Sequence, residues 1–227
     1  MVYFPSVLNN KIMASKLSGE TPTYFNTNEM KIILSDHLRN EDYSTWFLVY
    51  CLYHTGARVS ELVGDYETKN GIRTIIHQGV YVKDIDFHNR VIRIKTLKRE
   101  NHTRFVPLQP DTVGSFAAWV TDQGLTKESK LFPFGRKAAY NRVKKASEEA
   151  GFNDPPAERK GGKAIKSRQR RNLPHSMRHS FAIAAIASGV PLLTVSEWLG
   201  HQDIANTLIY VKMIAKDSAH FINQVRF

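Results

Sequence analysis

The sequence has one cysteine, no long apolar run and no leader-like N-terminus. Cys51 is the only cysteine among 227 residues, so the chain can form no disulfide with itself. It lies in the apolar stretch 46–52, where we interpret it as a small buried hydrophobe rather than a nucleophile. No apolar run approaches the ~20 residues of a membrane span, and no basic stretch followed by an apolar segment and a small-residue cleavage site opens the chain. We therefore expect a cytoplasmic protein with no membrane partner.

Acidic residues are scarce relative to basic ones. The chain holds 32 Lys and Arg against 21 Asp and Glu, a net charge of +11. A surplus of this size favours a polyanionic partner such as nucleic acid. Many basic proteins bind no DNA specifically, so charge alone does not decide the question.

Helical spacing of apolar residues accounts for most of the chain. Residues 1–24 show no clear period and predict an N-terminal arm, whereas 25–227 are long enough to form one domain with its own core. The last helices end at Gly189 and Gly200, because glycine tolerates the left-handed conformation that stops a helix. The predicted helices cover residues 26–37, 42–54, 113–120, 139–150, 176–188, 191–199 and a segment around Tyr210.

Between Thr74 and Leu108 the pattern changes to that of β-strands. Apolar and β-branched residues gather at 75–82, 90–95 and 104–108, and residues 86–89 are typical of a turn. The sequence thus predicts a small three-stranded antiparallel sheet inside a mainly α-helical α+β domain.

A basic segment at 153–172 has the composition of a loop. It is either a solvated flexible segment or an arm that pairs with DNA phosphates and orders on binding. Its seven candidate DNA-binding residues are Arg159, Lys160, Lys163, Lys166, Arg168, Arg170 and Arg171.

Three short motifs and one tyrosine carry the candidate chemistry. His175 and Arg178 stand three residues apart in His-Ser-Met-Arg-His, a spacing that places both on one face of a helix. Leu-Gly-His ends at His201, nine residues before Tyr210, and Thr-Gly-Ala-Arg-Val-Ser-Glu-Leu contains Arg58 far upstream. Each motif alone is a weak signal, but together they are specific.

These motifs resemble the catalytic domain of the tyrosine recombinase or phage-integrase family. That family shows Thr-Gly-x-Arg-x-x-Glu-Leu, a hairpin lysine, His-x-x-Arg-His, Leu-Gly-His and a nucleophilic tyrosine in this order. All five features are present, over about residues 25–215. The resemblance implies an enzyme that cuts and rejoins double-stranded DNA through a 3′-phosphotyrosine intermediate and a Holliday junction. Because that link preserves the energy of the broken bond, no cofactor is expected, and the sequence groups no metal ligands.

The resemblance also assigns roles within the site. Tyr210 is the nucleophile, and His175 is its base, because a phenol with a pKa near 10 needs help to lose its proton. Arg58 and Arg178 grip the phosphate oxygens with planar, permanently charged guanidinium groups. His201 is a further hydrogen-bond donor to that phosphate. Taken singly, these residues would be a core tyrosine, two surface cations and a helix-ending histidine.

The remaining site residues are less sharply placed. The hairpin lysine is Lys98 rather than Lys95, but the hairpin is slightly long, and a phosphate-positioning role for Lys95 stays open. We interpret Glu61 as a group that orients its surroundings rather than as a catalyst. His179 is either structural or an accessory hydrogen-bond donor.

Two other functions compete with a recombinase. A helix-turn-helix regulator would explain Ala185, Gly189 and Val195, but it would leave Arg58, His201 and Tyr210 without a purpose. A type IB topoisomerase shares the tyrosine, the arginines and the lysine, whereas the Leu-Gly-His motif favours a recombinase.

The ends of the chain predict how it assembles. Only about 25 residues precede the catalytic region, so we expect a minimal recombinase or one without a separate clamp domain. The tail 211–227 carries large apolar side chains that need cover, either on the chain's own core or on a neighbouring copy. The resemblance favours docking on a neighbour within a DNA-bound homotetramer. These side chains include Met213, Ile214, Phe221, Ile222, Val225 and Phe227.

Overall fold

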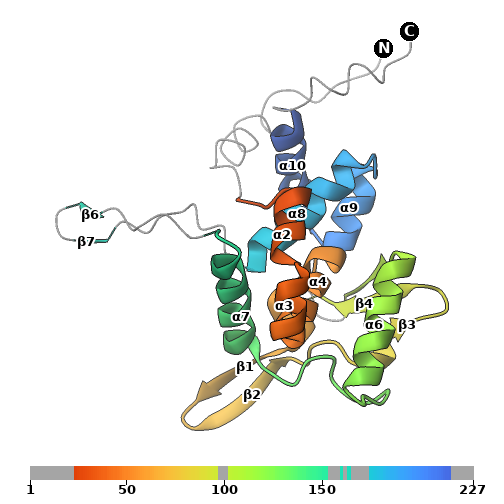
Figure 1. Cartoon of the computed structure of the whole chain (residues 1–227). Coiled ribbons are helices and arrows are strands. Elements are labelled where there is room, and N and C mark those ends of the chain that lie inside the picture. Colours follow the sequence, from red (N-terminus) through yellow and green to blue (C-terminus); the bar gives the residue numbers. More distant parts are fainter. Residues whose placement is uncertain (1–22, 97–101, 153–158, 161–162, 165–173, 216–227) are drawn as a thin grey trace, which may run out of the picture.

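The fold is built around helix α4, Tyr43–Thr55, which is buried on every side. The computed structural model describes residues 23–96, 102–152, 159–160, 163–164 and 174–215. Helices α3, α7 and α8 pack against α4, and in Figure 1 one small sheet lies below it and another to its right. The helices are α2 Thr27–Ile33, α3 Asp36–Glu41, α4, α5 Val59–Val63, α6 Pro110–Asp122, α7 Arg136–Glu149, α8 Pro174–Ala187, α9 Leu192–Leu199 and α10 Ala205–Ala215.

Helix α4 supplies the centre of the core because five consecutive residues, 45–49, are buried, so no face of the helix is left for solvent. Phe47 stacks on Trp119 of α6 with ring centroids 4.6 Å apart, which ties the two helices together. Cys51 is fully buried, as predicted, and burial raises the pKa of its thiol. The helix ends at Gly56, whose φ of +59° is left-handed.

The predicted three-stranded sheet exists, but its first strand was placed wrongly. The sheet consists of β3 Ile85–Asp86, β4 Val91–Lys95 and β5 Thr103–Pro107, all antiparallel. The predicted segment 75–82 instead contributes to a separate hairpin of β1 Asp65–Lys69 and β2 Ile72–His77, followed by the 3-10 turn Val82–Asp84. Ile75 and Ile76 are 64% and 55% exposed, so these β-branched residues form a strand without joining the core sheet.

Two further predictions are corrected by local capping and pairing. The predicted helix 26–37 is divided into α2 and α3, because Ser35 caps the backbone N–H of Leu38 and starts a new helix. Within the predicted loop 153–172, two dipeptides pair as a short ladder, β6 Arg159–Lys160 with β7 Lys163–Ala164. The remainder of that loop lies outside the described residues.

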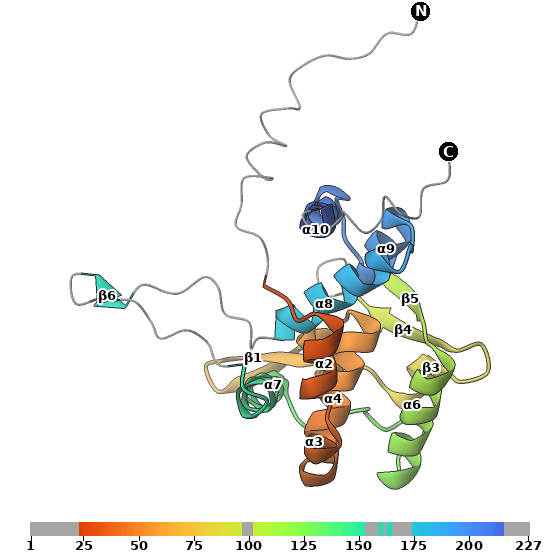
Figure 2. The same cartoon turned by 45° about the horizontal axis from the view of Figure 1, so that its top comes forward.

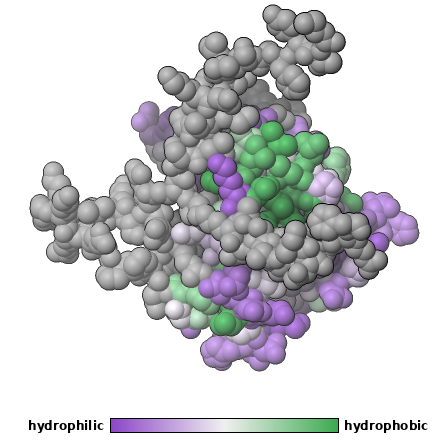
Figure 3. Space-filling view, turned by 90° about the horizontal axis from the view of Figure 1, so that it is seen from above, coloured by the Kyte–Doolittle hydropathy of each residue, from purple (hydrophilic) through white to green (hydrophobic). Residues whose placement is uncertain are grey.

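Helices α8, α9 and α10 form a second, smaller cluster that contains Tyr210. Helix α8 contacts both α4 and α10, and in Figures 1 and 2 it lies between the main core and the α9–α10 pair. The buried members of this cluster include Val195, Leu199 and Tyr210. Figure 3 shows an apolar patch on this upper face, where α9, α10 and the turn between them expose Leu193, Ile204 and Val211. Across the described ranges, the helices are too short or too polar to traverse a bilayer.

Replacing Gly56 by alanine should destabilise the protein more than the same replacement at a surface glycine with the same backbone conformation. A Cβ at Gly56 would lie 2.4 Å from Phe181 Cδ1, whereas Gly124, also at φ +59°, has nothing within 4 Å. We expect Gly124→Ala to cost about 1 kcal/mol for the left-handed conformation alone, and Gly56→Ala about 2 kcal/mol more from overpacking. Urea denaturation of the two variants measures the difference, and equal midpoints would contradict the packing described at Gly56.

Candidate active site

The carboxylate of Glu61 is the centre of the site. It is fully buried on α5, and its Oε1 accepts from Arg58 Nη1 at 2.8 Å. Its Oε2 accepts from Arg104 Nη2 at 2.6 Å and from the backbone N–H of Arg58 at 2.8 Å. Burial alone would raise the pKa of Glu61, but the ion pair and hydrogen bond with Arg104, together with the charge of Arg58, lower it to about 2. Glu61 is therefore ionised at neutral pH, and it holds both the side chain and the backbone N–H of Arg58.

Arg178 joins two loops that are far apart in the sequence. It lies on α8 with 3% exposure, and its Nη1 and Nη2 donate at 2.6 Å to the carbonyls of Gly56 and Leu199. Gly56 stands two residues before Arg58, and Leu199 stands two residues before His201, so Arg178 links the two loops that carry these residues. Burial and the charge of Arg58 lower the pKa of Arg178 to about 9, so it stays cationic at neutral pH. The two bonds use two of its five N–H groups.

His201 begins the turn between α9 and α10 in a neutral state. Gly200 ends α9 in the left-handed conformation, as predicted, and His201 Nδ1 lies 2.7 Å from Thr207 Oγ1. Burial and the charges of Arg178 and Arg58 lower the pKa of His201 to about 3. A neutral imidazole still carries one N–H, which suits the predicted role of hydrogen-bond donor to an anion.

Tyr210 points from α10 toward these groups. It is 2% exposed, its ring stacks on that of His201 at 6.5 Å, and its Oη lies 2.9 Å from His179 Nδ1. Burial raises the pKa of Tyr210, and the charges of Arg178 and Arg58 act in the opposite direction. The nucleophile predicted from the sequence thus lies within the electrostatic reach of both predicted arginines.

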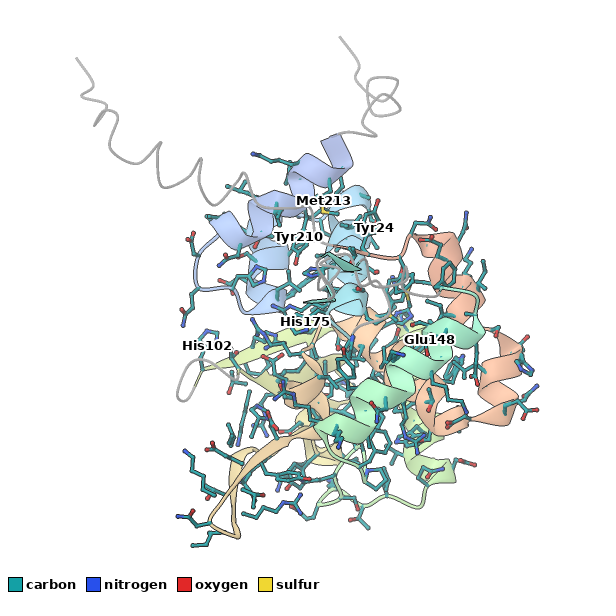
Figure 4. All side chains as sticks on the ribbon, turned by 90° about the vertical axis from the view of Figure 1, so that its left-hand side faces the viewer. Tyr24, His102, Glu148, His175, Tyr210 and Met213 are labelled. Carbon is teal, nitrogen blue, oxygen red and sulfur yellow. The ribbon has the colours of Figure 1, made fainter. Side chains whose placement is uncertain are left out.

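His175 lies on the same helix as Arg178 and is exposed, with its ring 6.3 Å from that of His179. Desolvation and the charges of Arg178 and Arg58 lower its pKa. Figure 4 shows His175 below Tyr210, with His102 of the β4–β5 hairpin to one side. The hydrogen-bond partner of the tyrosine hydroxyl, however, is His179, one helical turn further on.

Of the lysines and arginines predicted to contact DNA outside the catalytic site or to act as the hairpin lysine, the structure describes the side chain of Lys95 only. Lys95 is exposed on β4, and its carbonyl accepts from His77 Nε2 at 2.9 Å, because His77 Nδ1 already accepts from the backbone of Gly79. The side chains of Arg159, Lys160 and Lys163 on the β6–β7 ladder lie outside the described part of the structure. Five further predicted residues lie outside the described part altogether, namely Lys98, Lys166, Arg168, Arg170 and Arg171.

Arg104 belongs to the site but to none of the motifs in the sequence. Besides its bond to Glu61, its Nε donates to the carbonyl of Trp198 at 2.7 Å, and it is 4% exposed. It therefore connects the β4–β5 hairpin to both Arg58 and the end of α9. The alternation of strand residues could have identified Arg104, because it shares a strand face with the apolar Val106. A charged side chain on an apolar strand face needs a buried partner.

Comparison with known proteins identifies the family of the chain. Residues 24–216 match the Phage integrase family. The chain belongs to the phage integrase family. Its curated relatives include the tyrosine recombinase XerA of Saccharolobus solfataricus, 26% identical over 75% of this chain and 46% of that protein. Another, a tyrosine recombinase of Pseudothermotoga lettingae, is 23% identical over 92% of this chain and 63% of that protein. The chain thus covers between about half and just under two thirds of the length of these relatives.

Several solved structures share this fold. A XerA recombinase superposes with a TM-score of 0.65 at 19% identity, covering 92% of this chain and 68% of the other. The catalytic domain of bacteriophage HP1 integrase gives 0.58 at 18% identity, covering 90% and 96%. The Tn1549 transposon integrase, solved in complex with transposon right end DNA, gives 0.59 at 17% identity, covering 85% and 62%. The mainly helical α+β fold predicted from the sequence is confirmed.

The ionised carboxylate of Glu61 should make the free energy of unfolding depend on pH in the acid range. Its pKa is about 2 in the folded state and near 4.5 in the unfolded chain, so its contribution is complete above about pH 4.5 and is lost as the pH falls toward 2. We expect Glu61→Gln to be less stable by about 3 kcal/mol at pH 7, because it leaves two buried guanidinium groups without a counter-charge. The deficit should shrink between pH 4.5 and 2. Chemical denaturation across this range tests the claim, and a deficit that does not change with pH would contradict it.

Proposed function

We propose that the protein is a site-specific DNA recombinase that cuts and rejoins double-stranded DNA through a 3′-phosphotyrosine on Tyr210 and exchanges strands through a Holliday junction. The observation that carries this proposal is the position of Tyr210, within the electrostatic reach of Arg58 and Arg178 and next to His201. The same two positive charges favour the phenolate of Tyr210 and attract a phosphodiester. Membership of the phage integrase family supports the same chemistry.

The reaction consists of two balanced transfers at phosphorus. Tyr210 Oη gives its proton to a neighbouring histidine and attacks, the bond from phosphorus to the 5′ oxygen breaks, and that oxygen takes a proton from a separate acid. In the second transfer a 5′ hydroxyl, from the same or another strand, attacks the phosphotyrosine and releases Tyr210. Arg58 and Arg178 offset the charge that builds up on the non-bridging oxygens, and His201 donates a further hydrogen bond. Lys98 is the candidate acid for the leaving oxygen, with Lys95 as the alternative.

The partner in this proposal is double-stranded DNA, and its place of action is the cytoplasm. The net charge of +11 supports a polyanionic partner, and the Tn1549 integrase of similar fold was solved with DNA bound. Lys95 and the basic residues of 159–171 are proposed to contact phosphates. Assembly into a homotetramer through the tail 211–227 is also a proposal, since residues 216–227 lie outside the described part of the chain.

Tyr210→Phe should retain DNA binding and lose covalent attachment. Only the attacking oxygen is removed, and the basic surface is unchanged. The substrate is a duplex selected by the protein from random sequences, nicked near the cleavage site so that the covalent intermediate cannot reseal. Denaturing gels measure the adduct, and mobility shifts measure binding.

The adduct assay includes an excess of EDTA and no nucleotide. We expect full adduct formation by the parent protein under these conditions, because fixed arginines supply the charge stabilisation. Arg58→Ala should slow it about 10²- to 10³-fold, the usual cost of one lost oxyanion donor. Adduct formation by Tyr210→Phe, or a strict need for metal, would contradict the proposal.

A further inference from the structure

The hydroxyl of Tyr210 has a partner that neither the sequence motifs nor the family resemblance assigns. His179 Nδ1 lies 2.9 Å from Tyr210 Oη, and the two rings are 5.7 Å apart at their centroids. The contact joins α8 to α10, two helices that pack directly on each other. His175, to which the resemblance gives the role of base, is the more exposed of the two histidines and lies one turn away.

The surroundings of His179 keep it uncharged. On α8 its neighbours are His175 and Arg178. On the α10 side its neighbour is Tyr210, and His201 lies beyond that tyrosine. Burial, the neighbouring His175 and the charge of Arg178 lower the pKa of His179 to about 4. Burial also raises the pKa of Tyr210, so the pair at neutral pH is a neutral imidazole and a protonated phenol. A neutral imidazole offers one nitrogen as acceptor, and the phenol has one O–H to donate.

We propose that His179 is a catalytic residue that accepts the proton of Tyr210 as Oη attacks the phosphorus. This inference rests on the proposed function. During cleavage the Oη–phosphorus bond forms, the bond to the 5′ oxygen breaks, and the phenol proton moves to His179 Nδ1. During resealing the 5′ oxygen attacks, the Oη–phosphorus bond breaks, and Nδ1 returns its proton to Oη. The 5′ oxygen exchanges its own proton with the separate acid.

The charges around the pair support this direction of transfer. Protonated His179 would stand next to Arg178, an arrangement that is unfavourable in the free protein. A bound phosphodiester brings a negative charge to the same region and offsets the second cation. His179 is thereby expected to take the proton only when DNA is present, which leaves Tyr210 protonated and unreactive without it.

A base can be distinguished from a structural partner by changing the acidity of the phenol. His179→Asn keeps an acceptor oxygen close to the position of Nδ1 but cannot take a proton. It should form adduct 10²- to 10⁴-fold more slowly, the usual range for a lost general base. A fluorinated tyrosine at position 210 loses its proton more readily, so it should restore much of the rate in His179→Asn and change the parent rate little. His175→Asn is the matched control, and its loss of rate should not be restored.

The outcomes separate this inference from the proposed function. If the parent protein forms an adduct but fluorination restores His175→Asn instead, the base is His175 and the inference is wrong. If His179→Asn keeps the parent rate, the contact is structural and the inference is also wrong. If the parent forms no adduct at all, the proposed function itself fails. Circular dichroism checks folding, and His179→Gln serves as a second variant if His179→Asn is unfolded.

Discussion

The ion pairs of the buried Glu61 carboxylate are the interaction on which the site depends. Three guanidinium groups lie around it, on three different elements: Arg58 at the start of α5, Arg104 on β5 and Arg178 on α8. Without this carboxylate, burying two of these cations would carry a large desolvation cost. Arg104 and Arg178 also bind the carbonyls of Trp198 and Leu199, so the end of α9 is fixed by the same network. The position of His201 follows from it.

The network has a surplus of positive charge, which suits an anionic ligand. Three guanidinium groups and one carboxylate leave these four side chains with a net charge of +2. The histidines add no charge, because burial and the nearby arginines keep the pKa values of His179 and His201 at about 4 and about 3. A phosphodiester would therefore enter a region whose positive charges are already oriented by the fold, and little reorganisation would be needed. Tyr210 is buried, so the proposed mechanism requires its Oη to become accessible to the phosphate while it keeps the contact with His179.

The sequence predicted this site well where a short motif fixes local geometry. Glycines 56 and 200 end their helices in the left-handed conformation, which places Arg58 and His201 directly after the turns. Prediction was weaker where tertiary packing decides. The isoleucines of β2 favour a strand, but nothing local indicates that this strand pairs in an exposed hairpin rather than in the core sheet. Arg104 lies 43 positions from its partner Glu61, and His179 lies 31 positions from its partner Tyr210. The spacing within a short motif does not encode contacts over such separations.

The central claim is that this charge network prepares Tyr210 to form a covalent bond with DNA without a metal. Mass spectrometry of the peptides released from a DNA adduct, formed in excess EDTA, tests it most directly. The account predicts that one peptide carries the nucleotide, that the modified residue is Tyr210, and that the link is a 3′ phosphate. A nucleotide on any other residue, a 5′ link, or an adduct that forms only when a divalent metal is restored would contradict it.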